Sequence, residues 1–286
     1  MRSADAFYVF PKWKRAKEFA FGSQTKPSVV PPEDKAAYSA IFDELKGAAE
    51  AARDAAASGY RLELKPMNFS PIYGSRGHRP VDMWVSLCGA GSEALGQMPQ
   101  IYAIASDRGL EIGFAVSINE ADYHDAQVKA RNRRMVPVLY GKLPRRTDPM
   151  VQAIDEALAK AGGWRFNAKT RLSPGEPGWG AFSTLADLLS DLKTAGSASG
   201  GGAVCRVFAA SELAEVDLTA EFLAAVQTFL PLIARCAPTP WDQQVLRDQD
   251  QVEVLAEELA FDPTGVVGDR RIVLAAVAQR QGQAAF

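Results

Sequence analysis

Residues 82–118, DMWVSLCGAGSEALGQMPQIYAIASDRGLEIGFAVSI, contain the pattern that decides the fold class. Three short apolar runs within this stretch have the length and composition of strands: 82–88, 99–106 and 110–118. The turn at 107–109, Asp-Arg-Gly, joins the last two runs, and a short turn of this kind between two strands predicts a β-hairpin. The stretch therefore predicts three consecutive strands of a sheet.

The patterns on both sides extend this prediction. Two more runs are expected to be strands, 60–65 and 203–210. Helical spacing or helix start and stop signals occur in six segments: 33–57, 149–161, 182–194, 219–236 (bent at Pro231), 241–260 and 269–281. We therefore expect an α+β fold, in which a mixed, largely antiparallel sheet is flanked by helices and followed by an all-helical C-terminal segment.

Composition divides the chain into three parts. Residues 1–32 form an aromatic and basic N-terminal extension, 33–237 the main domain, and 238–286 an acidic helical linker. The net charge is only −2, yet it is strongly segregated. The segment 128–146 holds seven basic residues and no acidic one, whereas 212–269 holds twelve acidic and two basic residues. A basic body can attract the phosphates of a nucleic acid, although a solvated basic face would have the same composition.

The overall composition excludes several classes of protein. With 47% hydrophobic and 23% charged residues, the 286-residue chain is typical of a globular protein rather than of a disordered chain or a membrane bundle. No apolar run reaches the roughly 18–20 residues that a membrane span needs, and the N-terminus lacks a signal-peptide pattern. We therefore expect a cytoplasmic protein without a membrane partner.

The residues that usually carry chemistry are few. Two histidines exclude a metal site built on several histidines, and three widely spaced cysteines suggest neither a disulfide framework nor a CxxC metal site. The patterns GxSxG, GxxxxGK[ST], HExxH and GxGxxG do not occur. We therefore expect no catalytic residue, no metal ligand and no cofactor in this chain.

The segment 60–119 resembles the N-terminal DNA-binding domain of McrB-type, modification-dependent restriction proteins. The features that match are a strand with a lysine, an aromatic-Tyr-Gly turn, a Pro and a Trp that open a strand, the loop GAGSEA, and a hairpin that ends in Ser-Ile. The segment 203–233 is similar to the closing strand and final helix of that family. The resemblance spans residues 35–236 and implies a DNA-recognition domain.

The C-terminal run FDPTGVVGDRRIVLAAVAQRQGQAAF, residues 261–286, is similar to the segment that precedes and opens an HNH nuclease domain. This similarity implies that the chain is the recognition half of a longer endonuclease. A divalent metal would then belong to the nuclease domain that follows. The alternative for this segment is an ordinary amphipathic helix.

The McrB-type resemblance also implies a mechanism. Proteins of this family recognise a modified cytosine in double-stranded DNA by flipping the base into a pocket, at a cost of a few kcal/mol in lost stacking. We expect methylated, hydroxymethylated or glucosylated cytosine, with N6-methyladenine as a further candidate. The expected context is the specificity domain of a type IV restriction endonuclease in bacterial phage defence, with a homodimer through the parent nuclease left open.

Carried over residue by residue, the resemblance implies a base pocket that includes Tyr73 and Trp84. Trp84 could equally be a core aromatic, because it alternates with Ser86 and Cys88 along a strand, and Tyr73 could equally be a loop aromatic that caps the core. The family's third aromatic falls near Pro99, so Tyr102, three residues further on, is the nearest aromatic and is expected on the opposite face of that strand.

Basic residues next to these aromatics are the predicted DNA contacts. The loop that holds Tyr73 also contains three residues expected to insert into DNA or to contact phosphates: Arg76, His78 and Arg79. The basic run after the hairpin is expected to follow the phosphates: Lys129, Arg131, Arg133 and Arg134.

Two alternatives belong to other classes of protein. One is a protein-interaction domain whose acidic helical tail binds a partner, and an exposed apolar stripe on 219–233 would be its sign. The other is a stand-alone enzyme that holds a small anionic substrate on the basic run and uses Cys88 or His78 as nucleophile or base.

Overall fold

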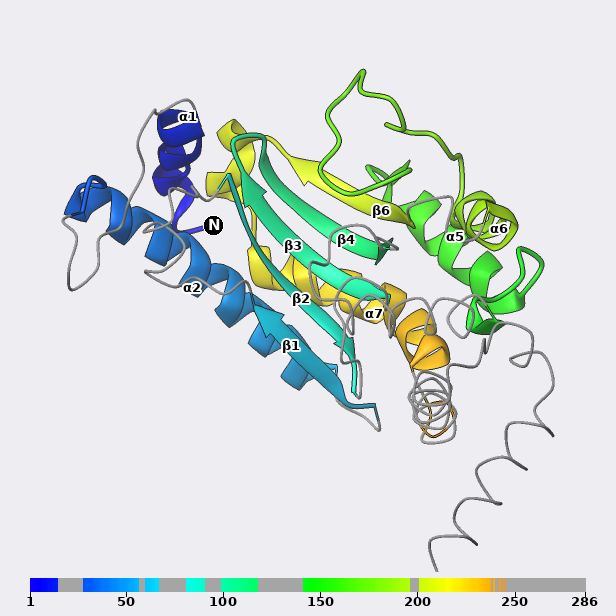
Figure 1. Cartoon of the computed structure of the whole chain (residues 1–286). Coiled ribbons are helices and arrows are strands. Elements are labelled where there is room, and N and C mark those ends of the chain that lie inside the picture. Colours follow the sequence, from blue (N-terminus) through cyan, green and yellow to red (C-terminus); the bar gives the residue numbers. More distant parts are fainter. Residues whose placement is uncertain are drawn as a thin grey trace, which may run out of the picture.

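Six strands form one antiparallel sheet in the order β1-β2-β3-β4-β6-β5 (Figure 1). The computed structural model describes residues 1–14, 28–56, 60–66, 81–90, 99–117, 141–195 and 201–237, together with 239, 242 and 244. The strand bounds are β1 Leu62–Pro66, β2 Asp82–Gly89, β3 Gln100–Ser106, β4 Gly109–Ser117, β5 Arg165–Asn167 and β6 Gly201–Phe208. The predicted α+β class and the predicted hairpin, β3–β4, are confirmed.

The helices also follow the sequence pattern closely. Their bounds are η1 Ala4–Tyr8, α1 Val9–Lys14, α2 Pro32–Ala55, α5 Pro149–Ala161, α6 Leu185–Ala195, η3 Ala210–Glu215 and α7 Leu218–Cys236. Four of the predicted helices are confirmed: 33–57, 149–161, 182–194 and 219–236. The two expected at 241–260 and 269–281 lie outside the described residues, apart from 242 and 244.

The main core lies between the sheet and the two long helices α2 and α7, which cover one face (Figure 1). Alternate strand residues point into it because the side chains of a strand change face at every residue. On β4, Phe114 stacks on Phe229 of α7 with ring centroids 5.1 Å apart. Full burial of each such ring stabilises the fold by about 1.5–3 kcal/mol.

The first fourteen residues belong to the same core. Phe7, Val9 and Phe10 are buried with α2, and Phe10 packs edge-on against the Tyr38 ring at 5.7 Å. The segment that looked like an aromatic and basic extension therefore contributes apolar side chains to the main domain.

Helix α7 is long and apolar enough to cross a membrane by length and composition, a test that core helices also pass. Its apolar side chains, among them Phe222, Val226 and Ile233, are buried in the main core. The exposed apolar stripe that a protein-interaction domain would need on 219–233 is therefore covered by the sheet.

Candidate functional site

The second face of the sheet, which α2 and α7 do not cover, carries the candidate site. The strand register sets its residues in rows. One row runs Trp84, Ile104, Glu111 and Val207 across β2, β3, β4 and β6. The next row along the strands is Ser86, Tyr102, Gly113 and Cys205. This face is thus more polar than the core face and has its own small apolar cluster around Tyr102 and Ile104.

Trp84 is a partly buried residue of this second face and contacts both the small cluster and the main core. Its neighbour two residues along β2 is Ser86, which is fully buried, and the Ser86 Oγ has no hydrogen-bond partner. A buried hydroxyl without a partner costs about 1–3 kcal/mol. Such an unpaired polar group beside an aromatic ring is therefore a point where a ligand atom would be stabilised.

Tyr102 lies on the same face as Trp84, because Ile104, the direct partner of Trp84, is two residues further along β3. Its side chain is only 2% exposed, and its hydroxyl donates a hydrogen bond of 2.6 Å to Glu111 Oε1. Burial, together with the neighbouring Glu111 carboxylate, raises the pKa of Tyr102 well above its ordinary value. The hydroxyl therefore stays a proton donor to Glu111, and the ring is covered rather than open to a base.

Glu111 is the carboxylate at the centre of the second face and is 5% exposed. Besides the Tyr102 hydroxyl, it accepts from the backbone N–H of Arg171 at 3.2 and 3.3 Å. Arg171 has a left-handed backbone with φ 62°, which is uncommon for a residue other than glycine. The buried charge is thus compensated by two donors from two different segments, as a buried carboxylate requires.

Arg171 also contacts β2 and the β3–β4 turn. Its Nε lies 2.8 Å from Oδ2 of Asp82, the first residue of β2, and its carbonyl accepts from the Arg108 guanidinium. Burial raises the pKa of Asp82, and the charges of Arg171 and Arg108 oppose that shift in part. Arg171 therefore joins β4, through Glu111, to the start of β2, through Asp82.

The chain that crosses the sheet is anchored at its other end by Asn167, the last residue of β5. This fully buried amide accepts from the backbone N–H of Gly180 at 2.8 Å and donates to Cys205 Sγ at 3.4 Å. Burial raises the pKa of the Cys205 thiol far above its ordinary value, so the sulfur remains a protonated, structural group. The segment between 167 and 180 is thereby held over β4 and β6.

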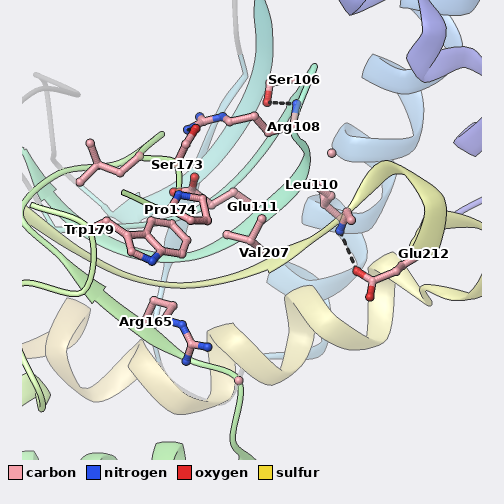
Figure 2. A pocket seen from close by; sticks show the side chains of 14 residues that line it. Ser106, Arg108, Leu110, Glu111, Arg165, Ser173, Pro174, Trp179, Val207 and Glu212 are labelled. Atoms are coloured by element: carbon pink, nitrogen blue, oxygen red, sulfur yellow. Dashed lines mark hydrogen bonds between the residues drawn. The ribbon is translucent and has the colours of Figure 1, made fainter. Parts of the chain in front are cut away.

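A cavity of about 480 Å³ lies under this segment, at the end of the sheet where the β3–β4 turn is found (Figure 2). Its walls come from the β3–β4 turn, the first residues of β4, the start of β5, the end of β6 and the chain at 172–179. The charged and aromatic side chains that line it are Arg108, Glu111, Arg165, Trp179 and Glu212. Glu111 therefore connects the cavity to Tyr102 and to the rest of the second face.

Gly109 shapes the turn at the mouth of this cavity. Its φ is +104°, and a Cβ there would lie 2.1 Å from the Phe208 carbonyl oxygen. Only glycine combines this conformation with such a close approach of two backbones.

Most of the residues predicted to contact DNA lie outside the described residues. These are Tyr73, Arg76, His78, Arg79, Lys129, Arg131, Arg133 and Arg134. The residues on either side of segment 67–80 are described: Pro66 is the last residue of β1, and Val81 directly precedes Asp82, which opens β2 and pairs with Arg171. Asp82 pairs with Ser106, which lines the cavity. The first residue of β2 thus lies at the end of the sheet that carries the cavity.

The other chemical candidates are placed as follows. Cys88 is buried in β2, and His78 lies outside the described residues. Within the described ranges, no group of three or more His, Cys, Asp or Glu side chains could hold a metal ion. Of the basic run, Lys142 pairs with Asp242 at 2.6 Å, while Arg145 and Arg146 are exposed.

The comparisons with known proteins add no assignment. No protein-family model matches the chain, and no curated protein matches it significantly.

Three residues of the site were not singled out from the sequence: Glu111, Arg165 and Arg171. Trp179 was expected to be a core or loop-packing residue rather than part of a site. Glu111 did leave a signal, because it is the one charged residue in the apolar run 110–118. A lone carboxylate in a strand that is otherwise apolar needs buried donors and therefore marks a polar site. Arg171 and Trp179 lie in a loop-like segment without periodicity, and their positions depend on contacts with distant strands.

Proposed function

We propose that this chain is a DNA-recognition domain that binds double-stranded DNA with a modified base, by flipping that base out of the helix. Methylated, hydroxymethylated and glucosylated cytosine are the leading bases, followed by N6-methyladenine. The domain would be the specificity part of a type IV restriction endonuclease in the bacterial cytoplasm. The divalent metal, and the contacts of a homodimer, would belong to its HNH nuclease part.

The observation that carries the proposal is the meeting of aromatic and basic residues at one end of the second face. Trp84 lies there, partly buried, beside the ion pair of Asp82 and Arg171. Arg108 donates to the Arg171 carbonyl, and Arg165 is exposed nearby at the cavity. Val81 and Asp82, the residues that follow the predicted inserting segment in sequence, are described at this end. Stacking on an aromatic ring and phosphate contacts are the two terms that offset the cost of flipping.

The unpaired Ser86 hydroxyl supports the same proposal. It is next to Trp84 on the second face and has no partner among the described residues. A base that stacked on Trp84 would bring hydrogen-bonding atoms on its edge close to this row of residues. Recognition of a base requires such groups, because phosphate contacts carry no sequence information.

Binding to matched duplexes tests the proposal. The duplexes carry unmodified, 5-methyl-, 5-hydroxymethyl- or glucosylated cytosine, or N6-methyladenine, and fluorescence anisotropy is measured at about 100 mM salt, where non-specific contacts are weakened. We expect one modified duplex to bind about tenfold or more tightly than the unmodified one. Equal, salt-sensitive binding of all duplexes would contradict base recognition.

Variants separate the base pocket from phosphate contacts. Trp84→Ala should weaken binding to the preferred duplex by about tenfold, as expected for lost stacking, and should change binding to unmodified DNA little. A double change, Arg133→Gln with Arg134→Gln, should weaken both about equally and reduce the salt dependence. Phe42→Ala, which removes another partly buried aromatic on α2, is the matched control and should leave the preference intact. Equal losses for Trp84→Ala and the arginine pair would contradict a base-contacting role of Trp84.

A further inference from the structure

The cavity of Figure 2 is lined by an arginine, Arg165, that has no carboxylate partner among the described residues. Arg165 is exposed, and its guanidinium donates to the carbonyl of the preceding residue, Trp164, at 3.2 Å. No carboxylate lies within ion-pair distance of it in the described part of the chain. The second arginine, Arg108, is already engaged by the Arg171 carbonyl and by Ser173 Oγ at 3.4 Å. Arg165 is the more exposed of the two and has the fewer contacts, so it can bind an anion, and its planar fork matches a phosphate or a carboxylate.

The same cavity contains a carboxylate with unused acceptor capacity. An ionised carboxylate has about four acceptor positions, and the described donors to Glu111 are the Tyr102 hydroxyl, the Cys205 thiol and a single N–H of Arg171 shared by both oxygens. The other carboxylate, Glu212, accepts from the backbone N–H of Ala209 at 2.8 Å (Figure 2). Glu111 can thus accept a further N–H from a molecule in the cavity.

Besides the arginine and the carboxylate, the cavity has an aromatic side chain. Trp179 lines the cavity with a partly buried indole, and its ring lies near Pro174 in Figure 2. Arg165 lines the same cavity from the start of β5 and is drawn beyond the β6 ribbon, with its guanidinium turned away from the indole. The planes of nucleobases stack on tryptophan at about 1–3 kcal/mol per base. The volume of about 480 Å³ lies within the range of pockets that hold small organic ligands, roughly 300–1,000 Å³.

We infer that this cavity binds a nucleotide whose base carries an exocyclic amino group. The base stacks on Trp179, the amino group donates to Glu111, and the phosphate is held by Arg165. A carboxylate that accepts from the amino group of cytosine is a known recognition pair. The ligand can be a free mononucleotide or a nucleotide of a DNA strand. Neither source requires the modified-base pocket at Trp84.

Calorimetric titration of the whole chain with cytidine and uridine monophosphates tests this inference, because uridine has a carbonyl where cytidine has the amino group. We expect the cytidine nucleotide to bind about fivefold or more tightly than the uridine nucleotide, and inorganic phosphate to bind more weakly than either. Equal affinities for the two nucleotides, or no binding at millimolar concentrations, would overturn the inference.

Three variants assign the contacts. Arg165→Gln should lower the affinity for the cytidine nucleotide roughly tenfold. Trp179→Leu should lower the affinities for both nucleotides by the same factor. Glu111→Gln should make the affinities for the cytidine and uridine nucleotides equal. Arg61→Gln, an exposed arginine before β1, is the matched control and should bind as the unchanged chain does. Arg165 is exposed, so its variant remains informative even if Glu111→Gln fails to fold. Unchanged binding by Arg165→Gln would refute the phosphate contact.

A short single-stranded oligo-dC separates the two sources of the nucleotide. Tighter, Arg165-dependent binding of the oligonucleotide supports a nucleotide within a strand, and binding of the free nucleotide alone supports a small-molecule site. The duplex preference measured with Trp84→Ala is independent of these titrations. If the cavity does not bind nucleotides, the titrations fail while the duplex preference remains. If the chain does not recognise a modified base, the duplex preference is absent while the titrations are unaffected.

Discussion

At the scale of single residues, two buried carboxylates organise their surroundings by the same means. Glu111 accepts from Tyr102 and Arg171 on the second face. Asp34, near the start of α2, accepts from Tyr8 and Trp13 at 2.8 Å each and pairs with Lys12 at 2.6 Å. Burial alone would raise the pKa of Asp34, but hydrogen bonds from Lys12, Tyr8 and Trp13 outweigh burial and lower it. Each carboxylate therefore ties a distant segment of the chain to the element that carries it.

The charge of Asp34 should make stability depend on pH. Because its folded pKa lies below the ordinary value of 3.8, its contribution is present above about pH 4 and is lost as the pH falls through the folded pKa. Asp34→Asn should lower the free energy of unfolding by about 1–3 kcal/mol at pH 7, and this difference should shrink below about pH 4. Urea unfolding of both proteins at pH 7 and at about pH 3 measures this difference in the free energy of unfolding.

Asp43→Asn, on an exposed position of the same helix, is the control and should change stability by less than about 0.5 kcal/mol. A difference between Asp34→Asn and the unchanged chain that stayed constant from pH 7 to pH 3 would show that the Asp34 charge is not involved.

At the scale of elements, carboxylates also begin the helices that flank the sheet. Asp148 and Asp217 precede α5 and α7 and accept from backbone N–H groups of the first turn, at 3.0 Å in both cases. At the start of α6, Thr184 Oγ1 accepts from the N–H of Asp187 at 3.0 Å, and Asp155 of α5 adds a cap from another helix by accepting from the N–H groups of Leu185 and Ala186. The caps by Asp148, Asp217 and Thr184 are local in sequence, whereas the cap by Asp155 depends on the packing of α5 against α6.

The cap of α7 should contribute measurably to stability. Asp217→Ala leaves the N–H of Ala220 without its side-chain partner and should lower the free energy of unfolding by about 1 kcal/mol, since caps of this type are worth 0.5–2 kcal/mol. Asp217→Ser should recover most of the loss, because a serine hydroxyl accepts the same bond. Thermal unfolding followed by circular dichroism measures both, and a serine variant no better than alanine would contradict a capping role.

At the scale of the whole molecule, one core joins the N-terminal residues, α2, the sheet and α7. Phe10 is central to that continuity, since it is fully buried and packs on both Phe7 and Tyr38. The structure therefore predicts that the N-terminal segment unfolds together with the sheet rather than separately.

Phe10→Ala should lower the free energy of unfolding by about 3–5 kcal/mol and keep a single transition, as expected for a large cavity in a shared core. Far-ultraviolet circular dichroism and tryptophan fluorescence should report the same midpoint. Val29→Ala, at an exposed apolar position, should have little effect. Local detachment of residues 1–14 with an unchanged midpoint for the sheet would contradict the shared core.

Local sequence patterns were sufficient to predict most of the helices and strands. The bounds of α5, Pro149–Ala161, are those predicted, and the strands and the 107–109 hairpin differ from their predicted bounds by at most two residues. Helical spacing, strand composition and turn chemistry act over a few residues, so they can be recognised without knowledge of the fold. The three-residue strand β5 and the short helices within 1–14 were missed, because segments this short carry no clear period.

The site needed the tertiary structure. The Tyr102–Glu111 bond requires the register of the hairpin, and the contact of Arg171 with Glu111 joins residues 60 positions apart. Strand order and the segment that crosses the sheet decide that Tyr102 is covered, that Trp84 shares its face, and that Arg165 and Trp179 line one cavity. Such contacts join residues distant in sequence, and no local periodicity encodes them. Sequence alone therefore defined the elements, while burial, charge pairing and the cavity arose only when those elements packed together.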